Sequence, residues 1–220
     1  MGWPSVATVR RLFANLVWTV IFFVLAGVAV LTQTERARSV SYVLRGPVKA
    51  APAFFLAGLS WYLNGPPLLT LAFFLCACGD ILLDMAKAGF TWAFEAGVVV
   101  FATALICLSM VYLSKPVAGY PLLPLSLPNI VLALFACVWV LPKIKHSLRM
   151  LGVAYLGLLV ASNIIASTSL VPVFLGSTLW LLSDLAIAIG RFIPGTPANG
   201  LTNLGIYDLG LYFIAFGFLL

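Results

Sequence analysis

The chain has 220 residues, of which 63% are hydrophobic and only 8% are charged, and its net charge is +6. A soluble domain carries about 25% charged residues, so this composition excludes a soluble globular protein and predicts a polytopic membrane protein. The excess of basic residues is what cytoplasmic loops of membrane proteins show, and it does not require a nucleic-acid partner.

Eight apolar runs approach the length of about 20 residues that a membrane-spanning helix needs. Short breaks rich in Pro, Gly, Asn or basic residues separate them, and no polar segment is long enough for a second domain. Backbone groups inside a bilayer must find partners within their own segment, so these runs must be helices. We therefore predict an all-α polytopic membrane protein, with one integral membrane domain over 1–220 and spans at roughly 12–32, 46–63, 67–86, 92–113, 122–141, 149–168, 170–190 and 201–220.

Lysines and arginines are divided unequally between the two ends of the predicted spans. The end that holds both termini carries Arg10, Arg11 and Lys115. The other end carries Arg36, Arg38, Arg45, Lys49, Lys87, Lys143, Lys145, Arg149 and Arg191. Because basic loops stay in the cytoplasm, we expect this second end to be cytoplasmic, although the arginine pair before the first span argues for the opposite. The expected location is a plasma membrane, such as the inner membrane of a bacterium.

Three of the carboxylates inside predicted spans interrupt long apolar runs in the third and seventh spans. Asp80 and Asp84 interrupt the third span in FFLCACGDILLDMAK (73–87), and Asp184 interrupts the seventh in STLWLLSDLAIAIGRF (177–192). An ionisable group inside a span costs about 2.5–3.5 kcal/mol on insertion scales, so it normally faces a cavity or a partner. These aspartates are therefore candidates for function.

The two aspartate segments suggest an internal repeat. The same sequence offset that relates the aspartates of the third and seventh spans also relates Arg45 to Arg149, at the starts of the second and sixth spans. Parallel repeats of this kind occur in other membrane folds. The pattern predicts two parallel halves of four helices each, 1–115 and 116–220.

The predicted topology brings five charges into one half of the membrane. Asp80 and Asp184 each precede the cytoplasmic end of their span by about six residues, or roughly 9 Å at the rise of an α-helix. Asp84 follows Asp80 by one turn on the same helix face. Lys49 enters the second span from the same side, and Arg191 marks the exit of the seventh span.

Two interpretations of this cluster remain open at the level of sequence. In the first, Lys49 neutralises Asp80 or Asp184 and the charges only tie helices together. In the second, they line a polar cavity in which two neighbouring carboxylates cannot both ionise easily, so that one serves as an acid while the other stays charged. Tyr207 and Asp208, near the cytoplasmic start of the last span, could join the same cluster.

At these residues the sequence resembles the YhhN-like lysoplasmalogenases, which are multi-spanning hydrolases of the alkenyl ether bond. Their third-span Gly-Asp-x-x-Leu pattern and seventh-span Ser-Asp-x-x-x-Ala pattern, ending near Arg-Phe, are both present here. So are a second span with Lys and Pro and a tyrosine in the last span. The matching residues are Lys49, Pro52, Gly79, Asp80, Leu83, Ser183, Asp184, Ala188, Arg191, Phe192 and Tyr207.

The chain departs from the family pattern at two places. The family often has a histidine in the fourth span, in a Gly-x-x-x-Phe-x-x-x-His pattern; here Gly97 and Phe101 fit, but Leu105 follows. A glutamine expected after Tyr207 is also absent, and Leu211 stands near its place. If those residues assist catalysis, this chain would differ in substrate preference or activity.

The resemblance implies hydrolysis of the vinyl ether bond of a lysoplasmalogen, giving a fatty aldehyde and a glycerophospho head group. The oxocarbenium chemistry needs an acid and a stabilising carboxylate, as in glycosidases; Asp80 and Asp184 are expected to fill these two catalytic roles in either order. Substrate binding or tuning of the carboxylates is expected from Lys49, Asp84, Ser183, Arg191, Tyr207 and Asp208.

The partner implied by the resemblance is a single-chain ether phospholipid, and the reaction needs no cofactor. No metal or nucleotide motif is visible in the sequence. Two rival functions remain at this point. A proton-coupled or small-solute transporter would also place Asp and Lys within the membrane, and a non-enzymatic lipid-binding protein would fit the absence of the family histidine.

Overall fold

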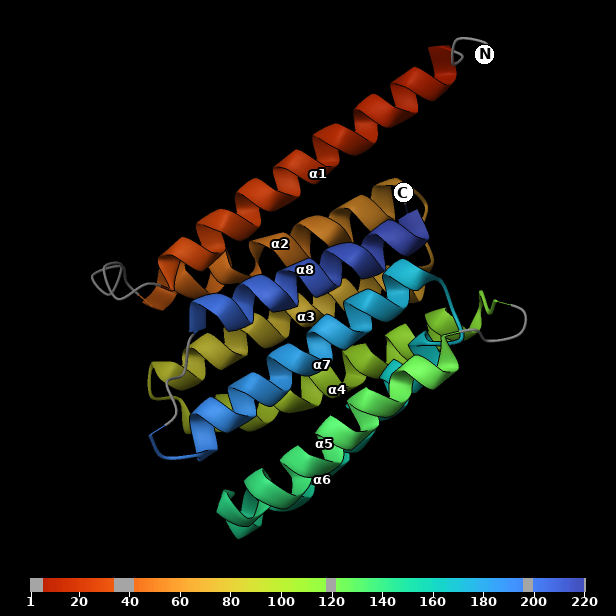
Figure 1. Cartoon of the computed structure of the whole chain (residues 1–220). Helices are drawn as coiled ribbons and strands as arrows, with labels where there is room; N and C mark the ends of the chain where they lie inside the picture. Colours follow the sequence, from red (N-terminus) through yellow and green to blue (C-terminus); the bar gives the residue numbers. More distant parts are fainter. Residues whose placement is uncertain (1–5, 34–41, 118–121, 196–199, 220) are drawn as a thin grey trace.

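The computed structural model describes residues 6–33, 42–117, 122–195 and 200–219, and these residues form helices joined by short connections, with no strand among them (Figure 1). The prediction of an all-α membrane protein is confirmed. The long helices are α1 (Val6–Thr32), α2 (Tyr42–Tyr62), α3 (Pro67–Lys87), α4 (Thr91–Leu113), α5 (Leu127–Val140), α6 (His146–Ala166), α7 (Val171–Phe192) and α8 (Gly200–Leu219).

The predicted fifth span is three segments and not one continuous α-helix. A 3-10 turn, Leu123–Ser126, precedes α5, and another, Leu141–Lys143, follows it. Each of the three segments has a proline in its first turn. Proline is tolerated in that position because no intrahelical bond is lost there, whereas in a helix interior it removes one. The prolines therefore mark where each new segment begins.

Within the described residues, seven helical segments are long and apolar enough to cross a membrane, and one of them, Leu123–Lys143, is α5 together with its two 3-10 turns. The exception is α2, which sequence analysis counts as a span. Arg45, Lys49 and two internal prolines, Pro47 and Pro52, make it less apolar than the others. Because α2 packs against α1, α3 and α8, its polar residues can face the protein interior, as charged groups inside spans usually do.

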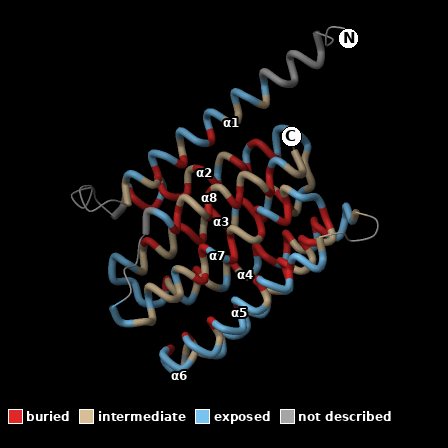
Figure 2. The backbone as a smooth tube through the Cα atoms, viewed as in Figure 1, coloured by how far each residue is buried: buried red, intermediate tan, exposed pale blue. Residues whose placement is uncertain are grey.

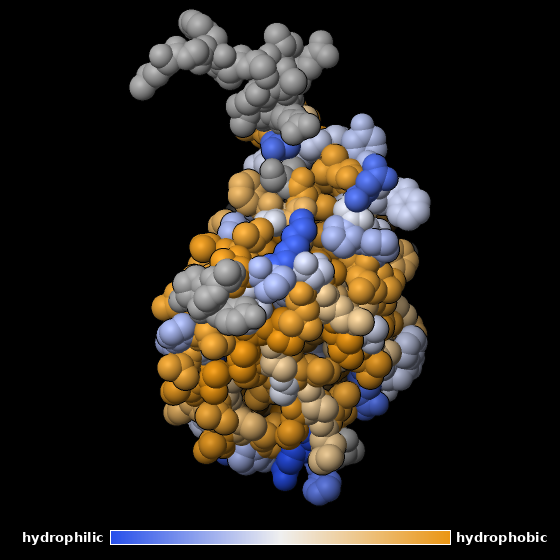
Figure 3. All heavy atoms as spheres, turned by 90° about the vertical axis from the view of Figure 1, so that its right-hand side faces the viewer, coloured by the Kyte–Doolittle hydropathy of each residue, from blue (hydrophilic) through white to orange (hydrophobic). Residues whose placement is uncertain are grey.

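The helices run alternately up and down, so the ends of α1, α3, α5 and α7 lie at the same end of the bundle as the starts of α2, α4, α6 and α8 (Figure 1). Buried residues concentrate in α2, α3, α4, α7 and α8, whereas α5 and α6 are exposed along much of their length (Figure 2). Hydrophobic residues cover most of the face seen in Figure 3. An apolar surface around a polar interior suits a lipid environment. The division into two parallel halves stays a prediction.

Helices α7 and α8 approach closely at two glycines. A Cβ atom on Gly176 would lie 2.5 Å from the carbonyl oxygen of Gly210, and one on Gly210 would lie 2.8 Å from that of Gly176. Small residues at membrane-helix interfaces allow the backbones to pack in this way. The α7–α8 pair carries Ser183, Asp184 and Tyr207, so this contact sets the position of several site residues.

Gly176→Ala is therefore expected to destabilise the protein by about 1–3 kcal/mol, the usual cost of overpacking, because the clash is with backbone and not with a side chain that could rotate away. Thermal unfolding in detergent measures the effect. Gly157→Ala in α6 is the matched control, since a Cβ there meets nothing within 4 Å. Equal melting temperatures for the two variants would contradict a tight α7–α8 contact.

Candidate functional site

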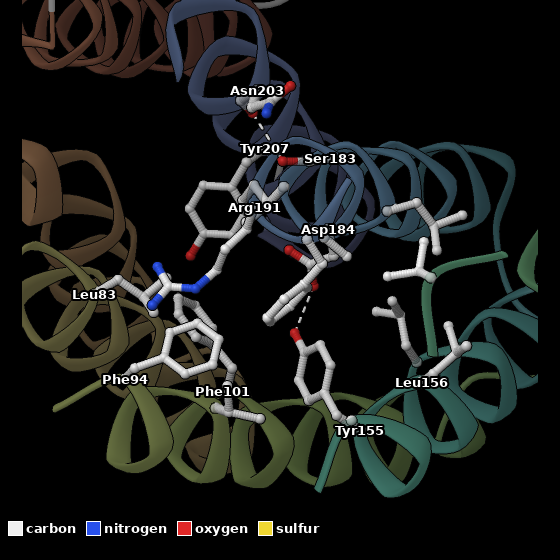
Figure 4. Close-up of a pocket in the computed structure, with 18 of the residues that line it drawn as sticks. Leu83, Phe94, Phe101, Tyr155, Leu156, Ser183, Asp184, Arg191, Asn203 and Tyr207 are labelled. Atoms are coloured by element: carbon white, nitrogen blue, oxygen red, sulfur yellow. Dashed lines mark hydrogen bonds between the residues drawn. The ribbon is translucent and has the colours of Figure 1, made fainter. Parts of the chain in front are cut away.

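A cavity of about 710 Å³ opens at the end of the bundle where α3 and α7 finish. Its wall is divided by chemistry. Charged and polar side chains, most of them from α2, α3, α7 and α8, form one part. Apolar side chains, most of them from α4, α5, α6 and α7, form the other part (Figure 4). The polar lining includes Gln33, Arg45, Lys49, Asp80, Lys87, Tyr155, Ser183, Asp184, Arg191, Asn203 and Tyr207.

Asp80 forms a buried ion pair in the polar part of the cavity. The Lys49 Nζ atom lies 2.8 Å from Asp80 Oδ1, and the two side chains are 10% and 3% exposed. Asp80 Oδ2 and the Tyr207 hydroxyl are both buried and have no hydrogen-bond partner among the described residues. Both side chains line the cavity. A ligand entering it would therefore meet one carboxyl oxygen and one hydroxyl that no other described residue is placed to bond.

Asp184 lies on α7 and has no cation bonded to it among the described residues. Its Oδ2 atom accepts a hydrogen bond from the Tyr155 hydroxyl at 2.5 Å (Figure 4) and another from Trp180 Nε1 at 2.9 Å. Trp180 precedes Asp184 by one helical turn, and Tyr155 reaches it from α6. Because both bonds go to Oδ2, the position of the carboxyl group is fixed while Oδ1 is left unbonded by the described residues.

The two aspartates predicted to meet do line the same cavity. They come from α3 and α7. Their environments differ, because Asp80 is ion-paired to Lys49 whereas Asp184 is held by two neutral donors. Two carboxyl groups in different surroundings are the arrangement that allows separate acid and base roles.

The mouth of the cavity is basic. The Gln33 Oε1 atom accepts hydrogen bonds from Arg45 Nη2 at 3.3 Å and from Lys87 Nζ at 3.4 Å. The Arg191 guanidinium, which also lines the cavity, lies over the Phe94 ring, 4.0 Å from its centroid. Figure 4 shows Arg191 reaching across the opening from α7. These groups, together with Lys49, give the mouth an excess of positive charge suited to an anionic group.

Three further predicted residues occupy different places relative to the cavity. Ser183 lines it and donates a hydrogen bond to the Asn203 carbonyl oxygen at 2.8 Å, which joins α7 to α8. Asp84 is 1% exposed and lies behind the wall, 3.7 Å from Lys87 Nζ. Asp208 is also outside the lining, and neither of its buried oxygens has a partner among the described residues.

Sequence reasoning missed five cavity-facing or supporting residues: Gln33, Arg45, Lys87, Tyr155 and Trp180. The sequence analysis uses Lys87 only for membrane orientation and Arg45 only for orientation and the internal repeat, although basic residues at a span end next to intramembrane aspartates are a usable signal. Tyr155 and Trp180 resemble ordinary span aromatics, and no spacing rule links α6 to α7. Their role follows only from the packing of the two helices.

Helix α4 supplies aromatic packing through Phe101, the phenylalanine of the family pattern in the fourth span. Phe101 lines the cavity and makes edge-on ring contacts with Trp180 and Tyr207, with centroids 6.2 and 6.1 Å apart. A Cβ on Gly79 would lie 2.6 Å from the Phe101 ring, so glycine before Asp80 makes room for it. Leu105, one turn further, is 3% exposed and does not line the cavity.

A sequence model of the YhhN family matches residues 44–218. The chain belongs to the YhhN family. The match runs from α2 to the end of α8 and so includes every charged residue of the cavity wall. No curated protein and no solved structure matches the chain.

In this YhhN-family protein, the cavity chemistry rests on carboxyl, hydroxyl and basic side chains. Among the described residues, no group of three or more His, Cys, Asp or Glu side chains is placed to hold a metal ion. Its four cysteines, Cys76, Cys78, Cys107 and Cys137, are free thiols, and of these only Cys137 lines the cavity.

Proposed function

We propose that this protein is an ether hydrolase that cleaves the vinyl ether bond of lysoplasmalogens. The observation that carries the proposal is one cavity with two unlike carboxyl groups, Asp80 paired with a lysine and Asp184 without a cation. A basic mouth lies on one side of them and an apolar wall on the other. Membership of the YhhN family supports the same activity.

The different partners of the two carboxyl groups support separate roles. Lys49 at 2.8 Å favours the carboxylate form of Asp80, which makes Asp80 the group that stabilises a developing positive charge. Asp184 is the proton donor. In its neutral form the carbonyl oxygen Oδ2 accepts the bonds from Tyr155 and Trp180, and the hydroxyl at Oδ1 is free to point at a substrate.

The proposed reaction begins when Asp184 gives its proton to the β-carbon of the vinyl ether. The π electrons form the new C–H bond, and the positive charge is shared between the α-carbon and the ether oxygen, beside the Asp80 carboxylate. Water adds to the α-carbon and returns a proton to Asp184. The hemiacetal then transfers its hydroxyl proton and breaks its bond to the glycerol oxygen, which yields a fatty aldehyde and an alcohol. Two carboxyl groups around an oxocarbenium ion also serve glycosidases.

The basic mouth is the proposed site for the phosphate of the head group. Arg45, Lys87 and Arg191 present donors there and would make charge-assisted bonds to phosphate oxygens. The mouth lies at the end of the bundle with most of the basic residues, which the positive-inside rule places in the cytoplasm. The substrate would then come from the cytoplasmic leaflet of the membrane that holds the protein.

The proposal is tested by incubating the protein in detergent with a lysoplasmalogen and measuring released fatty aldehyde. We expect aldehyde from the vinyl ether and none from the saturated alkyl ether of the same length, because only the vinyl ether forms an oxocarbenium ion on protonation. No membrane gradient should be needed. Activity that requires a sealed bilayer would favour the transporter, and binding of both ethers without aldehyde would favour a lipid-binding protein.

A further inference from the structure

The apolar part of the cavity forms a continuous wall beside the aspartates. On α6 it includes residues from every turn between Leu148 and Leu159, on α5 it includes Ala136 and Cys137, and on α7 it includes Ile187. Ile187 follows Asp184 by three residues, so the two side chains share one helix face. The hydrocarbon chain of a ligand whose reactive group lies at Asp184 would therefore pass along Ile187.

The inner end of this wall is closed. Ala136 and Leu159 are only 4% and 2% exposed. Leu159 lies one helical turn beyond Tyr155, which binds Asp184, so the space beyond the reactive position is roughly 6 Å deep along α6. Still deeper, Asn129 and Asn163 are hydrogen-bonded to each other at 3.0 Å and fill the region between α5 and α6. A long hydrocarbon chain cannot continue inward.

The wall is not closed towards the membrane. Ile187 lines the cavity and is 38% exposed, and Cys137 lines it and is half-buried. Both precede the ends of their helices, by five residues in α7 and three in α5, which places them about 5–8 Å inside the helix ends. The outward faces of α5 and α6 are apolar, with Val138 and Met150 more than three-quarters exposed.

We propose that the apolar wall binds one hydrocarbon chain, and that this chain reaches the cavity sideways from the bilayer, between α5 and α7 past Cys137 and Ile187. The inference rests on the proposed function, since it takes Asp184 as the position of the reactive bond. The head group lies at the basic mouth and the chain leaves through the side, so the substrate is bent at the bond that is cleaved. The far end of a long chain stays in the lipid.

Ile187→Trp tests the route, because the larger side chain would fill the opening. We expect hydrolysis of a long-chain lysoplasmalogen to fall at least tenfold. Cleavage of a glycerophospho vinyl ether with a chain short enough to be soluble should fall much less, since that substrate can enter through the basic mouth. Leu182→Trp is the matched control: Leu182 lies on the same helix, is 37% exposed and does not line the cavity. Unchanged long-chain hydrolysis in Ile187→Trp would overturn the route.

Labelling of Cys137 gives a second measurement on the otherwise native protein and does not depend on turnover. A saturated alkyl lysophospholipid, which is not cleaved, should slow maleimide modification of Cys137 several-fold and leave the half-buried Cys78, which is outside the cavity, unaffected. Equal labelling with and without the long-chain lipid would overturn the chain site. Protection without any aldehyde release from the vinyl ether would keep the chain site and reject the hydrolase.

Discussion

Asp184→Asn is expected to abolish release of fatty aldehyde, with kcat lower by about 10²–10⁴-fold, the usual contribution of a general acid. The amide cannot donate a proton to carbon, yet its carbonyl oxygen can still accept the bonds from Tyr155 and Trp180. Folding should therefore be preserved, and the saturated alkyl lysophospholipid should still bind. The measurement is the rate of aldehyde release at saturating vinyl ether, beside binding of the saturated analogue.

The matched control for this variant is Glu95→Gln. Glu95 is an exposed carboxylate on α4 that does not line the cavity, so the same chemical change there should leave the rate unaltered. Full activity in Asp184→Asn would remove Asp184 from the chemistry and shift the role of acid to another group. Loss of binding together with activity would instead mean that Asp184 holds the substrate.

Lys49→Gln is expected to lower the free energy of unfolding by about 3–5 kcal/mol, the cost of leaving one partner of a buried ion pair uncompensated. Asp80 is 2% exposed, and its only ion-pair partner among the described residues is Lys49. The double variant Lys49→Gln, Asp80→Asn should recover most of this stability, because the remaining pair is neutral and keeps hydrogen-bonding groups. Chemical denaturation in detergent measures all three unfolding free energies.

The activity of the same three variants separates structure from catalysis. If the pair only ties α2 to α3, the double variant should regain aldehyde release along with stability. We expect it to stay inactive, because the carboxylate that stabilises the oxocarbenium ion is gone. Lys143→Gln, at an exposed position near the same end of the bundle, is the control for removal of a basic residue. No loss of stability in Lys49→Gln would mean that Asp80 is neutral in the folded protein.

The local sequence was sufficient to predict the helices and their order along the chain. A run such as 92–113 is almost entirely apolar, and its backbone has no solvent partner in a bilayer, so helix is the only solution; α4 ends at Leu113 as expected. The 122–141 run was less well predicted, since its prolines divide it into an α-helix with a 3-10 turn at each end. Asp80 and Asp184 could be placed at one depth, because the rise per residue is fixed once the span ends are known.

Sequence by itself thus determined the helical membrane fold from the apolar spans, and the family from the motifs around Asp80 and Asp184. The alternation of the spans predicts that the two aspartates lie at one depth. Packing around the helix axes determined the rest, since depth along a span says nothing about rotation or about which neighbour a helix faces. Only the tertiary structure could pair Lys49 with Asp80 and not with Asp184, bring Tyr155 to Asp184, and place Asp84 behind the wall. These contacts join residues from different helices, so no spacing within one helix encodes them.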